Sequence, residues 1–421
     1  MQAFHQRNGE WFCEGVAVRR LAEEFGTPLY VYSEGHVVEQ YRALDEALGE
    51  RDHLICYAMK ANSNLAILRA LATAGAGFDI VSGGELQRVL RAGGTASRCV
   101  FSSVGKTADE IEFALRAGIY CFNVESEPEL REISRVAQRL GKKAPVALRV
   151  NPHVDPDTHH YISTGRKESK FGIGIERALA VYREASRLPG IEIRGVQMHI
   201  GSQITKTAPF VMAIRKVWPL VEQVQAMAPQ TLRSFDIGGG LGIRYRNERP
   251  PTAAQFVAAI RPWLDRATKR GLKILLEPGR FLVGNAGMLV TRVLYVKETR
   301  VKRFVIVDAA MNDLIRPALY DSYHEIVPIS RARARRVTVD VVGPVCESGD
   351  FFAKDRRLPM VQAGELLGIC SAGAYGMAMA SNYNARGRAA EVLVRGSRYA
   401  LVRRRETAKD LMAGEMLADW Q

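Results

Sequence analysis

One lysine, one histidine, one run of glycines and one glutamate–arginine pair are the residues of this chain best suited to chemistry. Each follows a short apolar run, in the segments YAMKAN (57–62), HIGS (199–202), DIGGG (236–240) and EPGR (277–280). A lysine partly buried in a polar pocket loses ammonium character and can form an imine with an aldehyde. Glycines let backbone N–H groups approach a phosphate closely. These residue types suit one anionic cofactor, provided that the fold brings them together.

Eight β-rich runs between residues 54 and 279 are the elements that would position these segments. The runs are 54–59, 77–81, 99–102, 119–124, 146–150, 195–200, 234–237 and 273–277. Between them, segments such as 66–72 and 256–260 carry apolar residues at the three- and four-residue spacing of an amphipathic helix. Alternating strands and helices imply parallel strands, and eight of them close a (β/α)8 TIM-type barrel. Such barrels carry their chemistry at the C-terminal ends of the strands, where all four segments fall.

Each feature also has an ordinary structural interpretation. A lysine at a strand end is usually a surface charge, and a histidine after an apolar strand is more often a hydrogen-bonded core residue. Three glycines, like a Pro-Gly pair, are commonly just a turn. The coincidence of these features at four of eight strand ends is what favours a shared site.

Pyridoxal 5′-phosphate is the cofactor that the set fits best. Lys60 supplies the amine, and Glu277 supplies a charge that keeps a pyridine nitrogen protonated, so that the ring accepts electrons. The phosphate is expected at the glycine run 238–240, because barrels bind phosphate in the loops after strands seven and eight. His199 can stack on the ring face, and Ser202 can reach a phosphate oxygen.

After Phe281 the alternation of strand-like and helical segments stops. Close-spaced, β-branched runs at 288–296, 303–308, 336–342 and 391–394 predict a mainly antiparallel β domain. The N-terminal segment, including residues 28–32, is expected to pack with it. We therefore predict an α/β protein with a barrel over 36–280 and a β domain made of 1–35 with 281–421. The long irregular stretch 151–174 is expected to be functional, as a lid.

Length and composition agree with a two-domain globular enzyme. A chain of 421 residues exceeds one ordinary domain, and its 47% hydrophobic and 25% charged residues suit a packed core. No apolar run reaches the roughly 18 residues that a membrane span needs, and the first residues do not resemble a signal peptide. The cytoplasm is therefore the expected location. The six cysteines are scattered, so neither a disulfide framework nor a metal site is expected.

The formal net charge of +14 raises the question of nucleic-acid binding. The basic residues are dispersed, apart from clusters at 331–336 and 403–405 that lack interleaved aromatic residues. We therefore expect neither a nucleic acid nor a membrane as a partner. A positive field could also attract an anionic cofactor and a carboxylate substrate.

The four strand-end segments resemble the motifs of the fold-type III pyridoxal-phosphate-dependent decarboxylases, which join such a barrel to a β domain. Further segments resemble the diaminopimelate decarboxylase branch of that family. These are THHYISTG (158–165), SKFGI (169–173), DAAMNDLIRPALY (308–320) and GPVCESGD (343–350). Together the matching segments cover nearly the whole chain.

The resemblance implies a role for each candidate residue. Lys60 is the Schiff-base lysine, and Glu277 pairs with the pyridine nitrogen. The other residues implied at the cofactor are Asp79, His199, Ser202, Gly238, Gly239, Gly240, Gly279, Arg280 and Tyr375. The residues implied at the substrate are Arg280, Arg316 and Tyr320 for the distal carboxylate, Glu347 for the distal ammonium group, and Tyr375. The residues implied in catalysis are Lys60, His199 and Cys346.

Cys346 is implied as the proton donor to the carbanion that remains when carbon dioxide leaves. In the family this cysteine comes across a dimer interface, so the resemblance implies a homodimer with shared active sites. A thiol with a pKa near about 8.5 is a plausible donor at neutral pH.

The implied reaction is decarboxylation of meso-2,6-diaminopimelate to L-lysine and carbon dioxide, the last step of lysine biosynthesis. A decarboxylase of ornithine, arginine or carboxynorspermidine is one alternative. Arg316 and Glu347 disfavour it, because a distal zwitterion needs one cation and one anion. An amino-acid racemase of similar barrel fold and a pyridoxal-phosphate-binding homologue without activity are the others.

Overall fold

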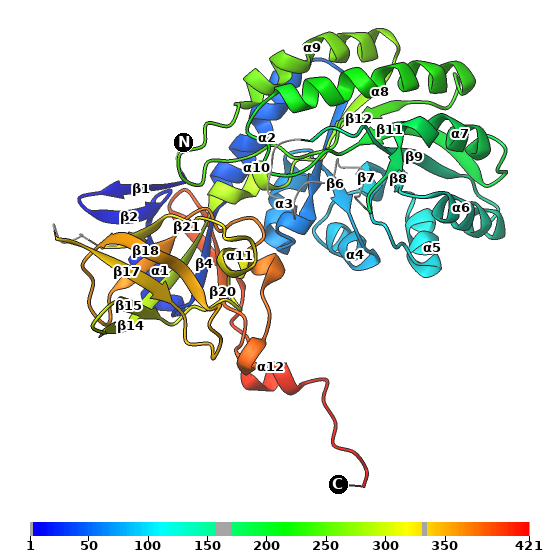
Figure 1. The fold of residues 1–421 in the computed structure, drawn as a ribbon. Helices are drawn as coiled ribbons and strands as arrows, with labels where there is room; N and C mark the ends of the chain where they lie inside the picture. Colours follow the sequence, from blue (N-terminus) through cyan, green and yellow to red (C-terminus); the bar gives the residue numbers. More distant parts are fainter. Residues whose placement is uncertain (1–2, 156–169, 331–334, 421) are drawn as a thin grey trace. The chain divides into compact units, whose positions relative to one another are not determined.

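The computed structural model describes residues 3–155, 170–330 and 335–420. Two compact units are formed, one by Val38–Arg244 with Glu248–Leu282 and the other by Met1–Val37, Tyr245–Asn247 and Val283–Gln421 (Figure 1). The predicted lid segment 158–165 and most of the basic cluster 331–336 lie outside the described residues. In the described part of the chain, every helix is too short or too polar to cross a lipid bilayer.

The first unit is a closed barrel of eight parallel strands. Its strands are β5 (His53–Ala58), β6 (Gly77–Ile80), β7 (Cys99–Phe101), β8 (Cys121–Val124), β9 (Ala144–Asn151), β11 (Ile191–Met198), β12 (Ser234–Asp236) and β13 (Lys273–Leu276). They pair in this order, and β13 pairs back to β5 to close the barrel. A two-residue strand, β10 (Ile173–Gly174), adds to β9. All eight predicted runs are confirmed as strands, and the TIM-type barrel is confirmed.

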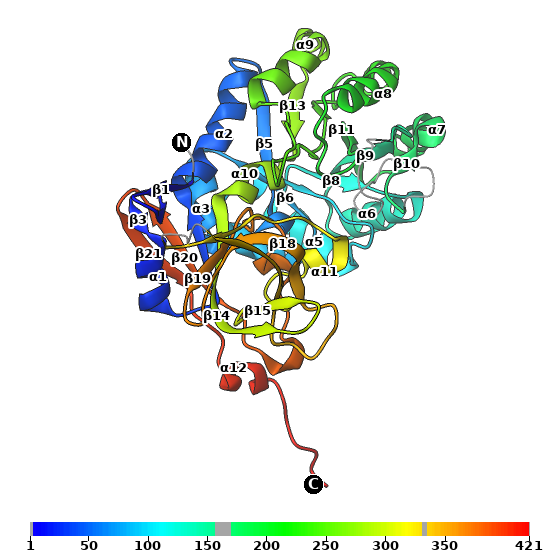
Figure 2. The same cartoon turned by 60° about the vertical axis from the view of Figure 1, so that its left-hand side comes forward.

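Helices surround these strands (Figure 2). They are α2 (Glu34–Leu48), α3 (Leu65–Thr73), α4 (Gly83–Arg91), α5 (Ala108–Ala117), α6 (Glu127–Arg139), α7 (Ile175–Ala185), α8 (Ala208–Met227), α9 (Ala253–Lys269) and α10 (Arg280–Val283). Ser82, Thr107, Ser126 and Thr252 cap the first turns of α4, α5, α6 and α9 through their hydroxyl oxygens. Because each cap fixes where a loop ends, the loops at the strand ends are held in defined positions.

The second unit is built on a sheet in the order β18-β17-β15-β14-β4-β20-β21, with β16 and β19 attached. Its strands are β4 (Leu29–Ser33), β14 (Gly287–Glu298), β15 (Arg303–Val307), β16 (Ile326–Pro328), β17 (Arg336–Val342), β18 (Phe351–Pro359), β19 (Leu366–Ile369), β20 (Ala390–Arg395) and β21 (Arg398–Arg403). Most pairs are antiparallel, as predicted, and β4 pairs with β14 and β20. The N-terminal segment therefore belongs to this sheet, as predicted.

Smaller elements complete the second unit. They are β1 (Phe4–Arg7), β2 (Glu10–Cys13), β3 (Val16–Ala17), α1 (Val18–Phe25), α11 (Arg316–Tyr320) and α12 (Ala408–Met412). The core beside β4 is apolar and includes Leu29, Val31, Met288 and Val290, each fully buried. All six cysteines are free, and Cys346 is the one that is exposed.

Candidate active site

Lys60 lies at the C-terminal end of β5, in a short 3-10 turn over Met59–Ala61. Its Nζ is 2.5 Å from Oδ2 of Asp79, the penultimate residue of β6, which is 1% exposed. The other carboxylate oxygen, Oδ1, is buried and has no hydrogen-bond partner among the described residues. The lysine side chain itself is 39% exposed. The amine is thus held by a buried carboxylate and remains accessible to a ligand.

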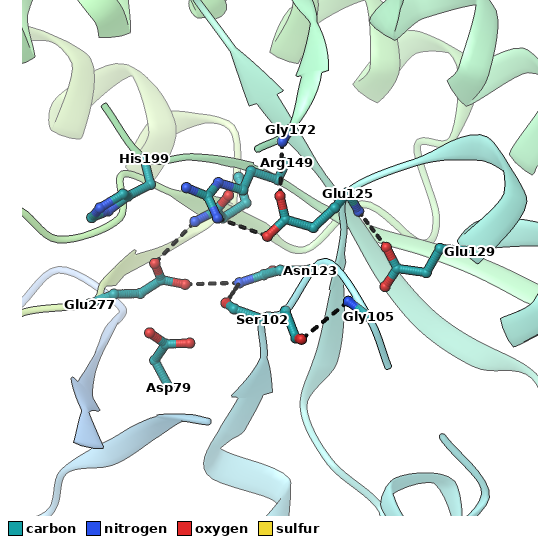
Figure 3. A network of polar contacts seen from close by, with 12 residues as sticks. Asp79, Ser102, Gly105, Asn123, Glu125, Glu129, Arg149, Gly172, His199 and Glu277 are labelled. Atoms are coloured by element: carbon teal, nitrogen blue, oxygen red, sulfur yellow. Dashed lines mark hydrogen bonds and ion pairs between the residues drawn. The ribbon is translucent and has the colours of Figure 1, made fainter. Parts of the chain in front are cut away.

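Glu277 follows β13 and is buried, with both carboxylate oxygens held by side-chain amides (Figure 3). Nδ2 of Asn123 donates to Oε1 at 2.8 Å, and Nε2 of Gln197 donates to Oε2 at 3.0 Å. Asn123 also donates to Oγ of Ser102 at 3.1 Å. These contacts fix the plane of the carboxylate in the barrel interior.

The sequence interpretation missed Asn123 and Gln197. Each is a polar residue flanked on both sides by apolar residues, within the runs 119–124 and 195–200. In a barrel strand such a residue is either on the outer face or in the interior, and an amide in the interior needs a polar partner. That signal could have identified them.

The Glu277 carboxylate belongs to a cluster of three buried acids with Asp79 and Asp236. Burial raises the pKa of Glu277 well above its usual range, the charges of Asp236 and Asp79 raise it further, and Lys60 opposes them. Burial also raises the pKa of Asp236 to about 7, against the lowering effect of the Gly238 N–H. Three buried acids thus face one lysine. A cationic group beside Glu277, such as a protonated pyridine ring, would relieve this excess of negative charge, so the residues present fit the expected cofactor.

His199 follows β11 as a neutral imidazole. Burial lowers the pKa of His199 well below its usual value, and the charges of Arg149 and Lys60 lower it further. Its Nδ1 accepts the N–H of Gly239 at 3.2 Å, which places the ring proton on Nε2. A neutral, fixed aromatic ring is suited to stacking on a flat cofactor.

The glycine run 238–240 has a structural reason that the sequence interpretation did not include. A Cβ at Gly238 would lie 2.2 Å from the Met198 carbonyl oxygen, and one at Gly239 would lie 2.0 Å from the Glu277 carbonyl oxygen. Gly238 and Gly240 also have φ of +75° and +105°. The ends of β11, β12 and β13 can therefore approach one another only because these residues lack side chains. Their proposed phosphate contact is an additional role.

Arg280 and Ser202 form a pair of donors from the loops after β13 and β11, the two strands on either side of β12. Nη2 of Arg280 donates to Oγ of Ser202 at 3.1 Å, and Arg280 is 5% exposed. The preceding residue is Gly279, where a Cβ would lie 3.0 Å from the Ala58 carbonyl oxygen. Because glycine has no Cβ, the loop after β13 can pack against the end of β5. A guanidinium, a hydroxyl and a glycine turn make a set of donors suited to a phosphate.

A chain of buried ion pairs and hydrogen bonds supports the ends of β8 and β9, and Figure 3 shows its members Arg149, Glu125, Gly172 and Glu129. Nη1 of Arg149 lies 2.7 Å from Oε1 of Glu125, whose other oxygen accepts the Gly172 N–H at 2.8 Å. The Glu125 N–H donates to Glu129 at 2.7 Å, and Glu129 pairs with the fully buried Lys106 at 2.5 Å. Lys106 is thus a structural cation, in contrast to the accessible Lys60.

Five of the predicted site residues belong to the β-sheet unit and are described there. Cys346 and Glu347 lie in the loop after β17, and the Cys346 N–H donates to Oδ1 of Asn384 at 3.0 Å. Tyr375 has φ of +57°, in the left-handed region. Arg316 begins α11 and is 5% exposed, and Tyr320 ends the same helix. Their roles toward a ligand remain predictions.

The acid cluster predicts how stability depends on pH in the cofactor-free protein. Because the pKa of Asp236 is raised in the folded state, the folded protein binds this proton more tightly than the unfolded chain does. The resulting contribution to the free energy of unfolding is complete below pH about 4 and is lost as the pH rises through about 7. Asp236→Asn keeps the oxygen that accepts the Gly238 N–H but cannot ionise. We expect urea unfolding to show wild type losing about 2 kcal/mol more than this variant between pH 5 and pH 7.5. If both proteins lost the same stability over this pH range, the role assigned to Asp236 would be contradicted. The raised pKa of Glu85, also about 7, is common to both proteins.

Known proteins resemble both the barrel and the whole chain. Residues 34–284 match the family described as pyridoxal-dependent decarboxylase, pyridoxal binding domain. A diaminopimelate decarboxylase from Pseudomonas aeruginosa is 55% identical over 417 residues, which are 99% of each protein.

Two solved structures are similar over nearly the full length. Diaminopimelate decarboxylase from Helicobacter pylori, complexed with L-lysine, superimposes with a TM-score of 0.90 at 43% identity and covers 94% of this chain and 98% of its own. The M. jannaschii enzyme, in co-complex with L-lysine, gives a TM-score of 0.93 at 39% identity, with 99% and 98% covered. The similarity therefore extends over both units.

Proposed function

The chain belongs to the diaminopimelate decarboxylase family of pyridoxal-dependent decarboxylases, and on that basis we propose that it converts meso-2,6-diaminopimelate into L-lysine and carbon dioxide. The observation that supports this most is the barrel mouth, where the accessible amine of Lys60 shares a buried acid cluster with Glu277. The reaction is the last step of lysine biosynthesis, and the cytoplasm remains its expected location.

Pyridoxal phosphate, when bound, would supply a ring that takes up the electron pair left by the departing carbon dioxide. Lys60 would hold the cofactor covalently, and Asp79 keeps the lysine at the end of β5. Glu277 would face the ring nitrogen, with its carboxylate plane set by Asn123 and Gln197. The neutral ring of His199 would stack on the flat face without adding charge.

The phosphate would lie at the ends of β11, β12 and β13. The backbone of Gly238, Gly239 and Gly240 would provide N–H donors, together with Gly279. The Arg280 guanidinium and the Ser202 hydroxyl, already joined at 3.1 Å, would provide side-chain donors. A dianion bound there would anchor the cofactor independently of the covalent bond.

The substrate would be recognised through its non-reacting end. We assign its carboxylate to Arg280, Arg316 and Tyr320, and its ammonium group to Glu347. Tyr375 would contact the cofactor or the substrate. A cation and an anion together match an amino-acid zwitterion, whereas a substrate that ends in an amine alone would leave the arginine without its carboxylate.

Cys346 would return a proton to the reacting carbon after carbon dioxide leaves. Its position on an exposed loop suits a residue supplied to a neighbouring subunit. We therefore propose a homodimer in which each subunit contributes Cys346 and Glu347 to the active site of the other.

A comparison of substrates tests the proposed function. The purified protein with pyridoxal phosphate is expected to release carbon dioxide from meso-diaminopimelate with a kcat/KM at least about 100-fold above that for ornithine, arginine or carboxynorspermidine. A preference for ornithine would contradict the substrate assignment. Conversion without carbon dioxide would instead indicate a racemase, and no conversion of any compound would indicate a non-catalytic homologue.

A further inference from the structure

A buried histidine, His324, contacts the arginine that we assign to the substrate carboxylate. His324 is 0% exposed and lies four residues after α11. Its Nε2 is 2.9 Å from Nη1 of Arg316, and its Nδ1 is 2.8 Å from the carbonyl oxygen of Cys370. The imidazole therefore links the start of α11 to the residue that follows β19.

These two contacts determine the state of the imidazole. A carbonyl oxygen can only accept, so Nδ1 must carry a proton, and a guanidinium can only donate, so Nε2 must be unprotonated. His324 is therefore a neutral acceptor toward Arg316. A carboxylate in the same position would orient the guanidinium but also neutralise it. A neutral imidazole orients it and preserves its charge for an anionic ligand.

Further contacts restrict the same guanidinium. The Arg316 Cζ lies 4.8 Å from the centroid of the Tyr245 ring, and Nη2 donates to Oγ of Ser322 at 3.3 Å. The Tyr245 ring in turn meets the His324 ring edge-on, at 5.4 Å between centroids. The aromatic face, the imidazole and the hydroxyl define one direction for the arginine.

Sheet pairing holds the histidine in place. Asp321 follows α11 with a φ of +50°, which ends the helix. The chain then turns back toward Arg316, the first residue of this helix. β16 then pairs with β19, with Ile326 opposite Ile369, and the Cys370 N–H donates to the Glu325 carbonyl oxygen at 2.8 Å. The position of the Cys370 carbonyl, and through it the tautomer of His324, therefore follows from the strand register.

We propose that His324 is a positioning residue for substrate specificity: it orients the Arg316 guanidinium toward the carboxylate at the non-reacting end of the substrate. This inference rests on the proposed function, because it takes Arg316 as a substrate residue. His324 acts through Arg316, so its loss should weaken binding of ligands that carry the distal carboxylate. Ligands that lack this group should be unaffected.

Two isosteric variants separate the contacts of His324. Asparagine places an amide near Nδ1, so His324→Asn keeps a donor for the Cys370 carbonyl and loses the acceptor for Arg316. Glutamine places an amide near Nε2, so His324→Gln keeps that acceptor. Tyr323→Phe, which removes a neighbouring hydroxyl, is the control. Each variant is first checked by thermal unfolding and by the visible absorbance of added pyridoxal phosphate.

Two kinds of measurement are made. Steady-state kinetics give kcat and KM for meso-diaminopimelate, and inhibition assays give the inhibition constants of L-lysine and cadaverine. These two inhibitors differ by the carboxylate alone. His324→Asn is expected to raise the KM and the L-lysine constant on the order of tenfold, with kcat within about twofold and the cadaverine constant unchanged. His324→Gln and Tyr323→Phe should stay within about threefold of wild type in every parameter.

Unchanged L-lysine inhibition in His324→Asn would overturn the proposal, as would an equal weakening of L-lysine and cadaverine. If His324→Asn does not fold, the test depends on His324→Gln, which keeps the acceptor for Arg316. If this variant still binds L-lysine in preference to cadaverine, the proposal is supported. If the variant has lost that preference, the proposal is overturned. A wild-type protein that does not convert meso-diaminopimelate would contradict the proposed function instead. The ratio of L-lysine to cadaverine binding, measured by calorimetry, would still test His324.

Discussion

Replacing Lys60 with alanine is expected to abolish the visible absorbance of bound pyridoxal phosphate and to lower kcat/KM on the order of 10⁴-fold or more, because we assign both the covalent anchor and the reacting amine to this one group. Lys60 is accessible at the end of β5 and is held there by Asp79. Lys106, which lies near the ends of β7 and β8, cannot replace it, because its side chain is fully buried in the pair with Glu129. Absorbance spectra and steady-state assays of the purified variant make the measurement.

Lys269→Ala is the matched control for this variant. Lys269 is exposed in the last turn of α9, where its removal takes away a charge but no buried partner. Its absorbance and kcat/KM should equal those of wild type. A Lys60→Ala protein that retained the absorbance band would show that the cofactor is attached elsewhere.

Replacing Glu277 with glutamine is expected to lower kcat/KM on the order of 10²- to 10³-fold without loss of stability. Activity falls because an amide cannot keep the ring nitrogen protonated. Stability is retained because the change removes one of three mutually repelling buried acids. The Gln197 amide oxygen has no hydrogen-bond partner among the described residues, so this amide can rotate and accept from the new side chain. Steady-state kinetics and urea unfolding at pH 7.5 provide the two measurements.

The combination of outcomes distinguishes a chemical role for Glu277 from a structural one. A merely structural residue with two amide donors would lose on the order of 1–3 kcal/mol of stability when changed, and its activity would fall only through unfolding. Glu222→Gln on the outer helix α8 breaks an exposed ion pair with Arg270 and keeps an oxygen that can accept the Trp218 indole N–H, so this control should change neither quantity. A stable Glu277→Gln protein with wild-type kinetics would contradict the role assigned to Glu277.

The barrel could be predicted because its signals are local. Each strand is a short apolar run, and the residue that leaves the run, such as Lys60, His199 or Glu277, stands at the strand end. The β-sheet unit was harder, because β18 and β21 carry charged residues on an exposed face that obscure the strand pattern. The assignment of Tyr245–Asn247 to the β-sheet unit had no local signal at all.

The supporting contacts of the site could not be predicted because they join distant residues. Glu125 and Arg149 are 24 residues apart and meet only because β8 and β9 are neighbours. In the sequence, nothing distinguishes His324 from an ordinary core histidine. In the structure, the pairing of β16 with β19 places the Cys370 carbonyl on one side of its ring and Arg316 on the other. Asn123 and Gln197 carried a signal, but their common partner, Glu277, becomes evident only in the closed barrel.

The most direct test of this account is to identify the residue that carries the cofactor. The protein is loaded with pyridoxal phosphate, reduced with borohydride to make the bond permanent, digested and analysed by mass spectrometry. We expect one pyridoxyl phosphate per chain, on the peptide that contains Lys60. A label on another lysine, or no label on a protein that decarboxylates meso-diaminopimelate, would contradict the account.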